Sequence, residues 1–239
     1  MSDSDPTLFD ETPTRPTSFR DFVYNQLKTA IITGRLRPGE RVLENRISAM
    51  LNVSRTPLRE AIGILEREGY FERIPTGGVR VSKLVLKELL QLNQVRIALE
   101  RLTAQLAARR MAEGPPSPED KRSLAELDAA MDRYDTDIAR GEPLSILESG
   151  HRVHQLIHRL SHNDVCAGLL DQVMGTMERY RALATVERSK VIARQHREIV
   201  EAIRSGDEER AVDLMTSHLE EAGEIYARSI MELQVDARE

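Results

Sequence analysis

The spacing of apolar residues changes once along this 239-residue chain, close to Lys83. After that point apolar residues recur every three or four positions, which is the period of an amphipathic helix. Short polar turns rich in Gly, Pro, Ser or Asn interrupt this period at intervals. The pattern predicts an all-α antiparallel bundle over 84–239. Its expected helices are 86–111, 118–140, 144–161, 164–184, 188–205 and 208–233.

Residues 18–83 show another order of elements. Helical spacing over 18–34, 44–51 and 55–68 is followed by two β-prone pieces, 70–74 and 79–82. Helix, tight turn, helix and hairpin is the order of a winged helix-turn-helix. We therefore expect a mainly α protein with an N-terminal winged helix-turn-helix and a C-terminal all-α antiparallel bundle. Residues 1–17 contain Pro, Asp and Thr without an apolar period and are predicted to be a disordered tail.

Charge is unevenly distributed along the chain. The net charge is −5, yet residues 12–83 contain 13 Lys and Arg against 7 Asp and Glu. This basic block predicts a polyanionic partner, and a solvated basic face is the alternative. The single cysteine, Cys166, fits a reducing compartment. With neither a membrane-spanning apolar run nor a secretory signal, the sequence predicts a cytoplasmic protein that does not use a membrane.

The start of the predicted helix 55–68 carries groups suited to DNA recognition. In a winged helix-turn-helix the N-terminal residues of this helix face base edges in the major groove. Arg55 and Arg59 lie four positions apart on one face, and each guanidinium can bind guanine in bidentate fashion. Ser54 and Thr56 offer hydroxyls for phosphate or base contacts. Gly77 and Gly78 allow the hairpin to approach a sugar-phosphate backbone closely.

The same segment resembles the GntR family of bacterial transcription regulators. The resemblance covers 18–83 and is strongest over Val53-Ser54-Arg55-Thr56-Pro57-Leu58-Arg59-Glu60-Ala61. It implies that Arg55 and Arg59 read a double-stranded DNA operator. The supporting contacts that it implies come from Asn45, Ser54, Thr56, Gly77 and Gly78. Asn45 stands where some relatives carry Arg.

Three of the six histidines are predicted to face the core of the bundle. On a helical wheel His196 and His218 fall inside apolar faces, and His154 borders one, whereas His151, His158 and His162 rotate toward the polar side. Inward-facing histidines from three helices suit a metal site in a bundle core. Hydrogen-bonded core histidines are the alternative interpretation.

Residues 84–239 resemble the FCD-type effector domain found within the GntR family. The similarity lies in the segments around His154, around Gln195-His196-Arg197-Glu198 and around His218-Leu219. It implies that His154, His196 and His218 hold a divalent metal ion, with Zn²⁺ or Ni²⁺ favoured by imidazole ligands. The usual fourth ligand, one turn before the first histidine, is replaced here by Gly150.

Arg96 is the expected anchor for an effector. It follows the R-x-x-L-E pattern of the resembled family together with Leu99 and Glu100, which implies a clamp for the carboxylate of a small organic acid. A helical ion pair with Glu100 is the alternative role. The helical period predicts that Arg96 lies at the edge of an apolar stripe formed by Leu92, Val95, Leu99, Leu102 and Leu106, which would face the core.

These features together predict a transcription regulator, more specifically a repressor, and not an enzyme. We expect a homodimer, because two heads would bind the half-sites of a pseudo-palindromic operator. Residues 84–239 would serve effector binding and dimerisation. Two alternatives are a metal-dependent hydrolase-like enzyme, which a three-histidine metal could support, and an architectural DNA-binding protein that needs no effector.

Overall fold

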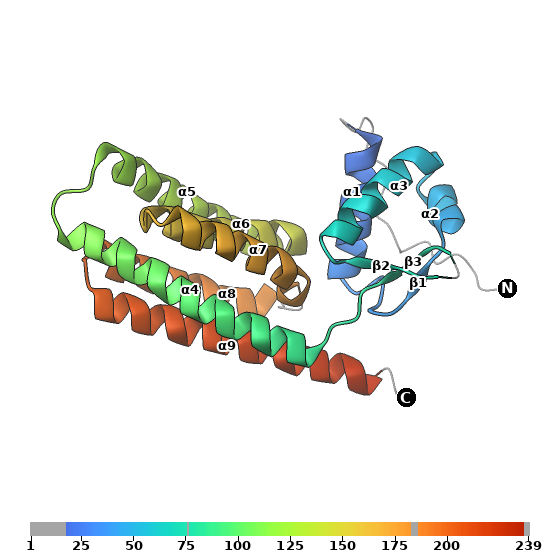
Figure 1. Cartoon of the computed structure of the whole chain (residues 1–239). Helices are drawn as coiled ribbons and strands as arrows, with labels where there is room; N and C mark the ends of the chain where they lie inside the picture. The colour runs from blue at the N-terminus through green and yellow to red at the C-terminus, as the bar shows by residue number, and fades with distance from the viewer. Residues whose placement is uncertain (1–17, 76, 183–185, 237–239) are drawn as a thin grey trace. The chain divides into compact units, whose positions relative to one another are not determined.

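The computed structural model describes residues 18–75, 77–182 and 186–236. The predicted tail at 1–17 and the turn residue Thr76 lie outside the described residues. The chain divides into two compact units, 1–84 and 85–239. The fold class is confirmed, since a winged helix-turn-helix precedes an all-α bundle (Figure 1).

The N-terminal unit combines short helices with a small antiparallel sheet of strand order β1-β3-β2. Strands β2 and β3 form the predicted hairpin, with Phe71 opposite Val81. Strand β1 was not predicted, because two residues are too few to show alternation. The described elements are α1 (Phe19–Ile32), β1 (Arg41–Val42), α2 (Glu44–Met50), α3 (Arg55–Arg67), β2 (Phe71–Arg73) and β3 (Val79–Val81).

The core of this unit holds α3 in place. Leu58, Ala61, Ile62 and Leu65 of α3 are buried against α1 and the sheet. Their spacing leaves the opposite face of α3 open to solvent. The helix-turn-helix therefore exposes the N-terminal end of α3, which is the part that base recognition requires.

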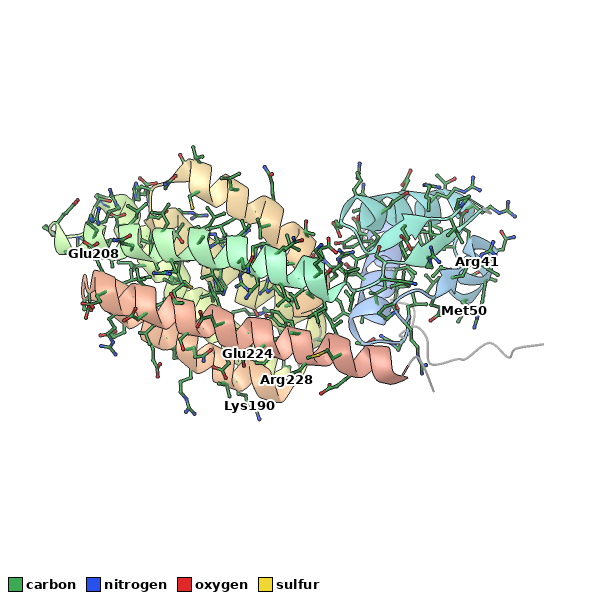
Figure 2. All side chains as sticks on the ribbon, turned by 60° about the horizontal axis from the view of Figure 1, so that its bottom comes forward. Arg41, Met50, Lys190, Glu208, Glu224 and Arg228 are labelled. Carbon is green, nitrogen blue, oxygen red and sulfur yellow. The ribbon has the colours of Figure 1, made fainter. Side chains whose placement is uncertain are left out.

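The C-terminal unit is organised around its first helix. Helix α4 packs against α6, α7, α8 and α9, and Figure 1 shows α4 and α9 running alongside each other. At one end of this pair, Arg109 of α4 forms a 2.8 Å ion pair with Glu208 (Figure 2). The helices are α4 (Leu86–Ala112), α5 (Pro118–Arg140), α6 (Pro143–Leu160), α7 (Asp164–Arg181), α8 (Val186–Arg204) and α9 (Glu208–Asp236).

The prediction that the apolar stripe of α4 faces the core is wrong. Val95 and Leu102 are 49% and 39% exposed, and Leu92, Leu99 and Leu106 are only partly buried. The buried face of α4 consists mostly of small and polar residues instead, because four other helices pack against it. That face contains Leu89, Asn93, Arg96, Glu100, Thr103, Ala104, Ala107 and Ala108.

The N-terminus of α5 is fixed by a capping box between Ser117 and Asp120. Asp120 also accepts hydrogen bonds from Arg110 and His162, so it ties α5 to the turn after α6. Burial raises the pKa of Asp120, but the hydrogen bonds from Ser117 and His162 outweigh it and lower the pKa to about 2.

Replacing Asp120 by Asn should lower the free energy of unfolding at pH 7 by about 1 kcal/mol, the usual value of a cap. Because the folded pKa is depressed, this contribution is present above the unfolded pKa of about 3.9 and is lost as pH falls through the folded value. Urea unfolding at several pH values measures both effects. The exposed neighbour Glu119→Gln is the control, and equal losses in both variants would contradict the capping role.

Candidate functional site: a histidine chamber and a DNA-binding surface

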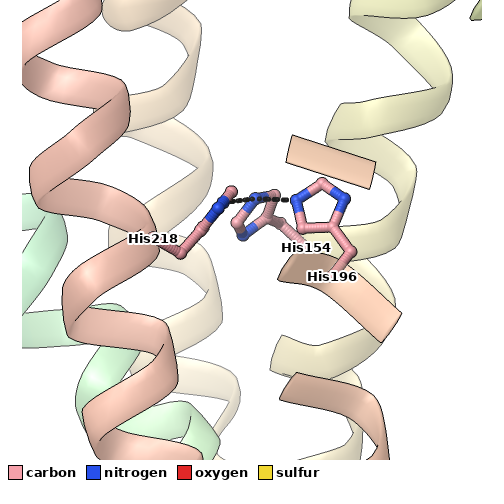
Figure 3. Close-up of side chains that lie close together, drawn as sticks. All are labelled: His154, His196 and His218. Atoms are coloured by element: carbon pink, nitrogen blue, oxygen red, sulfur yellow. Dashed lines mark hydrogen bonds between the residues drawn. The ribbon is translucent and has the colours of Figure 1, made fainter. Parts of the chain in front are cut away.

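Three buried histidines meet in the middle of the C-terminal unit. His154 of α6, His196 of α8 and His218 of α9 point toward one another (Figure 3). The Nε2 atom of His154 lies 3.1 Å from Nε2 of His196 and 3.4 Å from Nε2 of His218. Three aromatic nitrogens from three helices thus converge on one point.

Hydrogen bonds to the outer nitrogens fix the tautomers of two of these rings. His154 Nδ1 lies 2.7 Å from Glu100 Oε2, and an ionised carboxylate can only accept, so Nδ1 carries the proton. His218 Nδ1 donates to Gln195 Oε1 at 2.9 Å, and the amide nitrogen of Gln195 is engaged with Glu221. The Nε2 atoms of His154 and His218 are therefore unprotonated acceptors, and Arg96 Nη2 lies 3.3 Å from Nε2 of His154.

The three imidazoles are held in the neutral form. Burial is the main cause that lowers the pKa of His154 to about 4. The charge of Glu100 raises this pKa, whereas the charges of Arg96 and Arg181 lower it further. Burial likewise lowers the pKa of His196 and His218 well below the usual range. At neutral pH these side chains are thus available as metal ligands, which must be unprotonated.

Glu100 organises this region, which we call the histidine chamber: Arg96, Glu100, His154, His158, His196 and His218. It pairs with Arg96 Nε at 3.0 Å and lies 3.1 Å from His158 Nε2. Although burial opposes its charge, His154, Arg96 and His158 lower the pKa of Glu100 well below its usual range. Glu100 is therefore the negative centre of the chamber.

The structure corrects two expectations here. Arg96 does not lie at the edge of the core but is 1% exposed, and it makes both the helical pair with Glu100 and a 3.3 Å contact from Nη2 to His154 Nε2. Its Nη1 atom is buried with no hydrogen-bond partner among the described residues. His158 does not face the polar side: it is 2% exposed, and its Nε2 atom lies 3.1 Å from Glu100 Oε2 of α4.

The three-histidine set fits a divalent metal ion. A tetrahedral zinc site with bonds of about 2.0–2.1 Å separates its nitrogen ligands by about 3.3 Å, close to the separations observed. The hydrogen bond from His154 Nδ1 to the Glu100 carboxylate is the one that a zinc-bound histidine usually makes with its second ring nitrogen. His154 and His218 both present an unprotonated Nε2 to this point, which is the form a metal ligand must have. Glu100, His154 and His158 form a second group with ligand atoms in range.

The fourth-ligand position is filled in an unexpected way. A Cβ atom on Gly150 would lie 3.2 Å from the ring of Tyr134, so that ring takes the space a larger side chain would need. The same ring lies 5.5 Å from the ring of His196. The neighbouring His151 keeps its Nδ1 atom buried without a hydrogen-bond partner in the described part of the chain.

The predicted DNA-contacting side chains all lie on the surface of the N-terminal unit. Arg55, Thr56 and Arg59 are exposed on α3, and Asn45 is exposed on α2. Ser54 stands at the N-cap of α3 but makes no capping hydrogen bond. Arg59 is paired with Glu44 at 2.8 Å across the helix-turn-helix.

The hairpin has the conformation that its glycines permit. Gly77 and Gly78 adopt φ values of +89° and +86°, in the left-handed region that other residues avoid. Arg41 of β1, labelled in Figure 2, donates to the carbonyl oxygen of Gly77 at 3.0 Å. The guanidinium group of Arg41 therefore lies beside the backbone of Gly77 in the hairpin.

The geometry defines a class of protein: a winged helix-turn-helix module followed by a helical bundle with a polar central chamber, the organisation of a DNA-binding transcription regulator. Comparison with known proteins agrees. Residues 19–81 match the family model for bacterial regulatory proteins of the gntR family, and residues 91–221 match the FCD domain. The chain belongs to the GntR family of transcription regulators, in the group that carries an FCD domain.

Two curated relatives and one solved structure illustrate the similarity. The uncharacterised HTH-type transcriptional regulator YdhC of Bacillus subtilis is 29% identical over 85% of this chain and 89% of its own length. The HTH-type transcriptional repressor RspR of Escherichia coli is 26% identical, covering 89% and 90%. The structure of E. coli McbR/YncC superposes with a TM-score of 0.65 at 19% identity, covering 89% and 99%.

These findings decide between the alternatives raised by the sequence. Because the family and the relatives are transcription regulators, the chain is a regulator and the hydrolase alternative is discarded. GntR regulators bind DNA, which accounts for the basic N-terminal unit. Among the described helices, none is both long and apolar enough to cross a bilayer.

Sequence reasoning missed two contributors to the chamber. His158 lies one helical turn from His154, so its spacing could have placed both rings near one carboxylate. Tyr134 is the other, and no pattern in α5 distinguished it from an ordinary core residue. Its role becomes visible only when α5 and α6 are packed together.

Proposed function

We propose that this regulator is a repressor whose affinity for its operator depends on a divalent metal ion and an organic acid bound in the histidine chamber. The observation that carries the proposal is the convergence of the Nε2 atoms of His154, His196 and His218 around one point. Imidazole ligands favour Zn²⁺ or Ni²⁺. Operator DNA lies in the bacterial cytoplasm, where we place the protein.

The proposed DNA contacts fall into two groups. Arg55 and Arg59 read guanines in the major groove, while Ser54, Thr56 and Asn45 position α3 against phosphates and bases. Gly77 and Gly78 bring the wing backbone close to the DNA. Glu44 holds Arg59 in an extended position that leaves its guanidinium at the surface.

The metal ion and Arg96 would together bind the effector. His154, His196 and His218 would hold the ion, whose charge supplies attraction for a carboxylate. Arg96 has one η-nitrogen without a partner, and its other η-nitrogen contacts the His154 lone pair that a metal would take. A metal on His154 would therefore release a two-pronged donor for the carboxylate. Such binding alters DNA affinity only through unequal affinity for two conformations.

An exposed apolar band supports the proposed homodimer. Val95 and Leu102 on α4, and Val165 and Leu169 on the adjacent α7, are exposed apolar side chains. A band of this kind is typical of a surface that another copy covers. We propose that residues 84–239 dimerise through α4 and α7.

The double substitution Val95→Glu and Leu102→Glu should convert the dimer into a monomer, because it places charges in the centre of the interface. Light scattering coupled to size-exclusion chromatography measures the mass directly. Leu90→Glu is the matched control, since Leu90 is equally exposed on another face of α4. A dimer that survives the double substitution would contradict this interface.

Elemental mass spectrometry of untagged full-length protein tests the metal site. We expect about one equivalent of Zn or Ni per chain, lost in His196→Ala and retained in His162→Ala. His162 is the control because its ring is partly exposed and pairs with Asp120 outside the chamber. Protein without metal after growth and refolding in Zn²⁺ or Ni²⁺ would refute the site.

A further inference from the structure

A fourth histidine of the chamber, His158, contacts the same carboxylate as His154. Glu100 Oε2 lies 2.7 Å from His154 Nδ1 and 3.1 Å from His158 Nε2, while Glu100 Oε1 accepts from Arg96 Nε at 3.0 Å. An ionised carboxylate has no proton to donate, so both imidazole nitrogens are donors. Because His154 and His158 are one turn apart on α6, both rings reach one carboxylate of α4.

These contacts lie away from solvent. Glu100 is 0% exposed, His154 1% and His158 2%. A buried carboxylate is costly unless protein groups supply its hydrogen bonds. Among the described residues, the donors to Glu100 are Arg96, His154 and His158. Loss of the His158 donor therefore leaves Oε2 with His154 as its one partner in that set, and the orientation of the carboxylate is less well determined.

A second metal ion between Glu100, His154 and His158 is another interpretation of this group. The 2.7 Å separation of Glu100 Oε2 from His154 Nδ1 is that of a hydrogen bond, and it is shorter than the separation of about 3.3 Å between two ligands of a tetrahedral zinc ion. Arg96 also places a positive charge against the same carboxylate, which disfavours a second cation. The group is therefore a chain of hydrogen bonds that ends at His154.

We propose that His158 is a positioning residue of the metal site and acts through Glu100. Its Nε2–H group fixes the Glu100 carboxylate, and the carboxylate holds the proton of His154 on Nδ1. The Nε2 atom of His154 is consequently unprotonated and directed toward His196 and His218. This inference rests on the proposed function, since it assigns a residue that supports the metal ligands of the same chamber.

Replacing His158 by Gln and by Leu separates its donor role from its packing. Gln retains an N–H group that can reach Glu100, whereas Leu fills the space without a donor. The full-length protein is stripped of metal, and its Zn²⁺ affinity is measured by competition with a chromophoric chelator. His158→Leu should bind Zn²⁺ about 10- to 100-fold more weakly than the wild type, the usual loss when a group that orients a metal-bound histidine is removed. His158→Gln should restore affinity close to that of the wild type.

His162→Leu is the matched control, because it makes the same exchange in the turn after α6, at a ring that pairs with Asp120 outside the chamber. It should leave Zn²⁺ affinity unchanged. Thermal unfolding verifies that each variant is folded, and His158→Phe provides the variant without a donor if His158→Leu is not.

Wild-type Zn²⁺ affinity in a folded variant without the donor would overturn the inference, as would an equal loss in His158→Gln. Wild-type protein that binds no Zn²⁺ would refute both the metal site and its positioning by His158. Zinc affinities that follow the predicted order while operator affinity stays independent of metal would instead refute metal control alone, so the two failures are distinguishable.

Discussion

Replacement of both Arg55 and Arg59 by Ala should weaken operator binding by about 2–6 kcal/mol, because each bidentate arginine–guanine pair contributes about 1–3 kcal/mol. This corresponds to a loss of roughly 30-fold to more than 10⁴-fold in affinity. Both side chains are exposed on α3 and do not support the core, so the variant should fold normally. Fluorescence anisotropy on oligonucleotides selected from a random pool by the wild-type protein measures the effect.

The control for this prediction is Arg35→Ala. Arg35 lies beyond the end of α1, and its Nε donates to Thr33. This substitution removes one positive charge, half of the charge lost in the double variant, from a part of the N-terminal unit outside the helix-turn-helix. Equal losses in the control and in the double variant would show a general electrostatic effect, and α3 would then not be the recognition helix.

Replacing Glu100 by Gln should lower the free energy of unfolding by about 3–5 kcal/mol, the usual result when one partner of a buried pair is removed. Glu100 is fully buried and neutralises Arg96, and the substitution leaves that guanidinium without a counter-charge. Urea unfolding measures the change. The control is Glu88→Gln on the same helix, whose partly exposed pair with Arg179 should contribute less than about 1 kcal/mol.

The stabilisation by Glu100 has a defined pH dependence. Its pKa is depressed in the folded protein, so its contribution is present above the unfolded pKa of about 4.3 and is lost as pH falls through the lower folded value. The difference between wild type and Glu100→Gln should therefore stay constant above about pH 5. A difference that disappears near neutral pH would show that Glu100 is protonated in the folded chain.

The N-terminal unit was predictable because its signals are local. Pro57 in the first turn of α3 and two glycines in the hairpin each determine backbone geometry within a few residues, and Ser54 stands at the N-cap position of α3. Strand β1, which the sequence did not predict, depends on the long-range pairing of Val42 with Val79. Such pairing leaves no periodic pattern in the sequence.

The helices of the bundle were predictable from the sequence, but the buried face of α4 was not. Helical period gives the existence and length of a helix, whereas the buried face depends on which neighbours pack against it. Around α4 the close approach of α9 favours small residues. Gly223 of α9 illustrates this, because a Cβ atom there would lie 2.3 Å from Asn93 Nδ2. The predicted apolar stripe of α4 consequently lies toward the surface and not in the core.

The histidine chamber was predictable in part for the same reason. His154, His196 and His218 lie on apolar faces of their own helices, so the helical wheel placed them inward. The partners that give the chamber its chemistry come from elsewhere: Glu100 from α4 and Gln195 from α8. Which nitrogen each ring presents follows from those partners and cannot be read from spacing.

The affinity of the selected operator DNA, measured with the metal-loaded protein and again after chelation, shows whether the histidine chamber controls DNA binding. We expect a change of at least about fivefold, the lower range of allosteric coupling, in the wild-type protein and none in His196→Ala. His162→Ala should respond like the wild type. Identical operator affinity in all three proteins, with and without metal, would contradict control by the histidine chamber and leave an architectural DNA-binding protein.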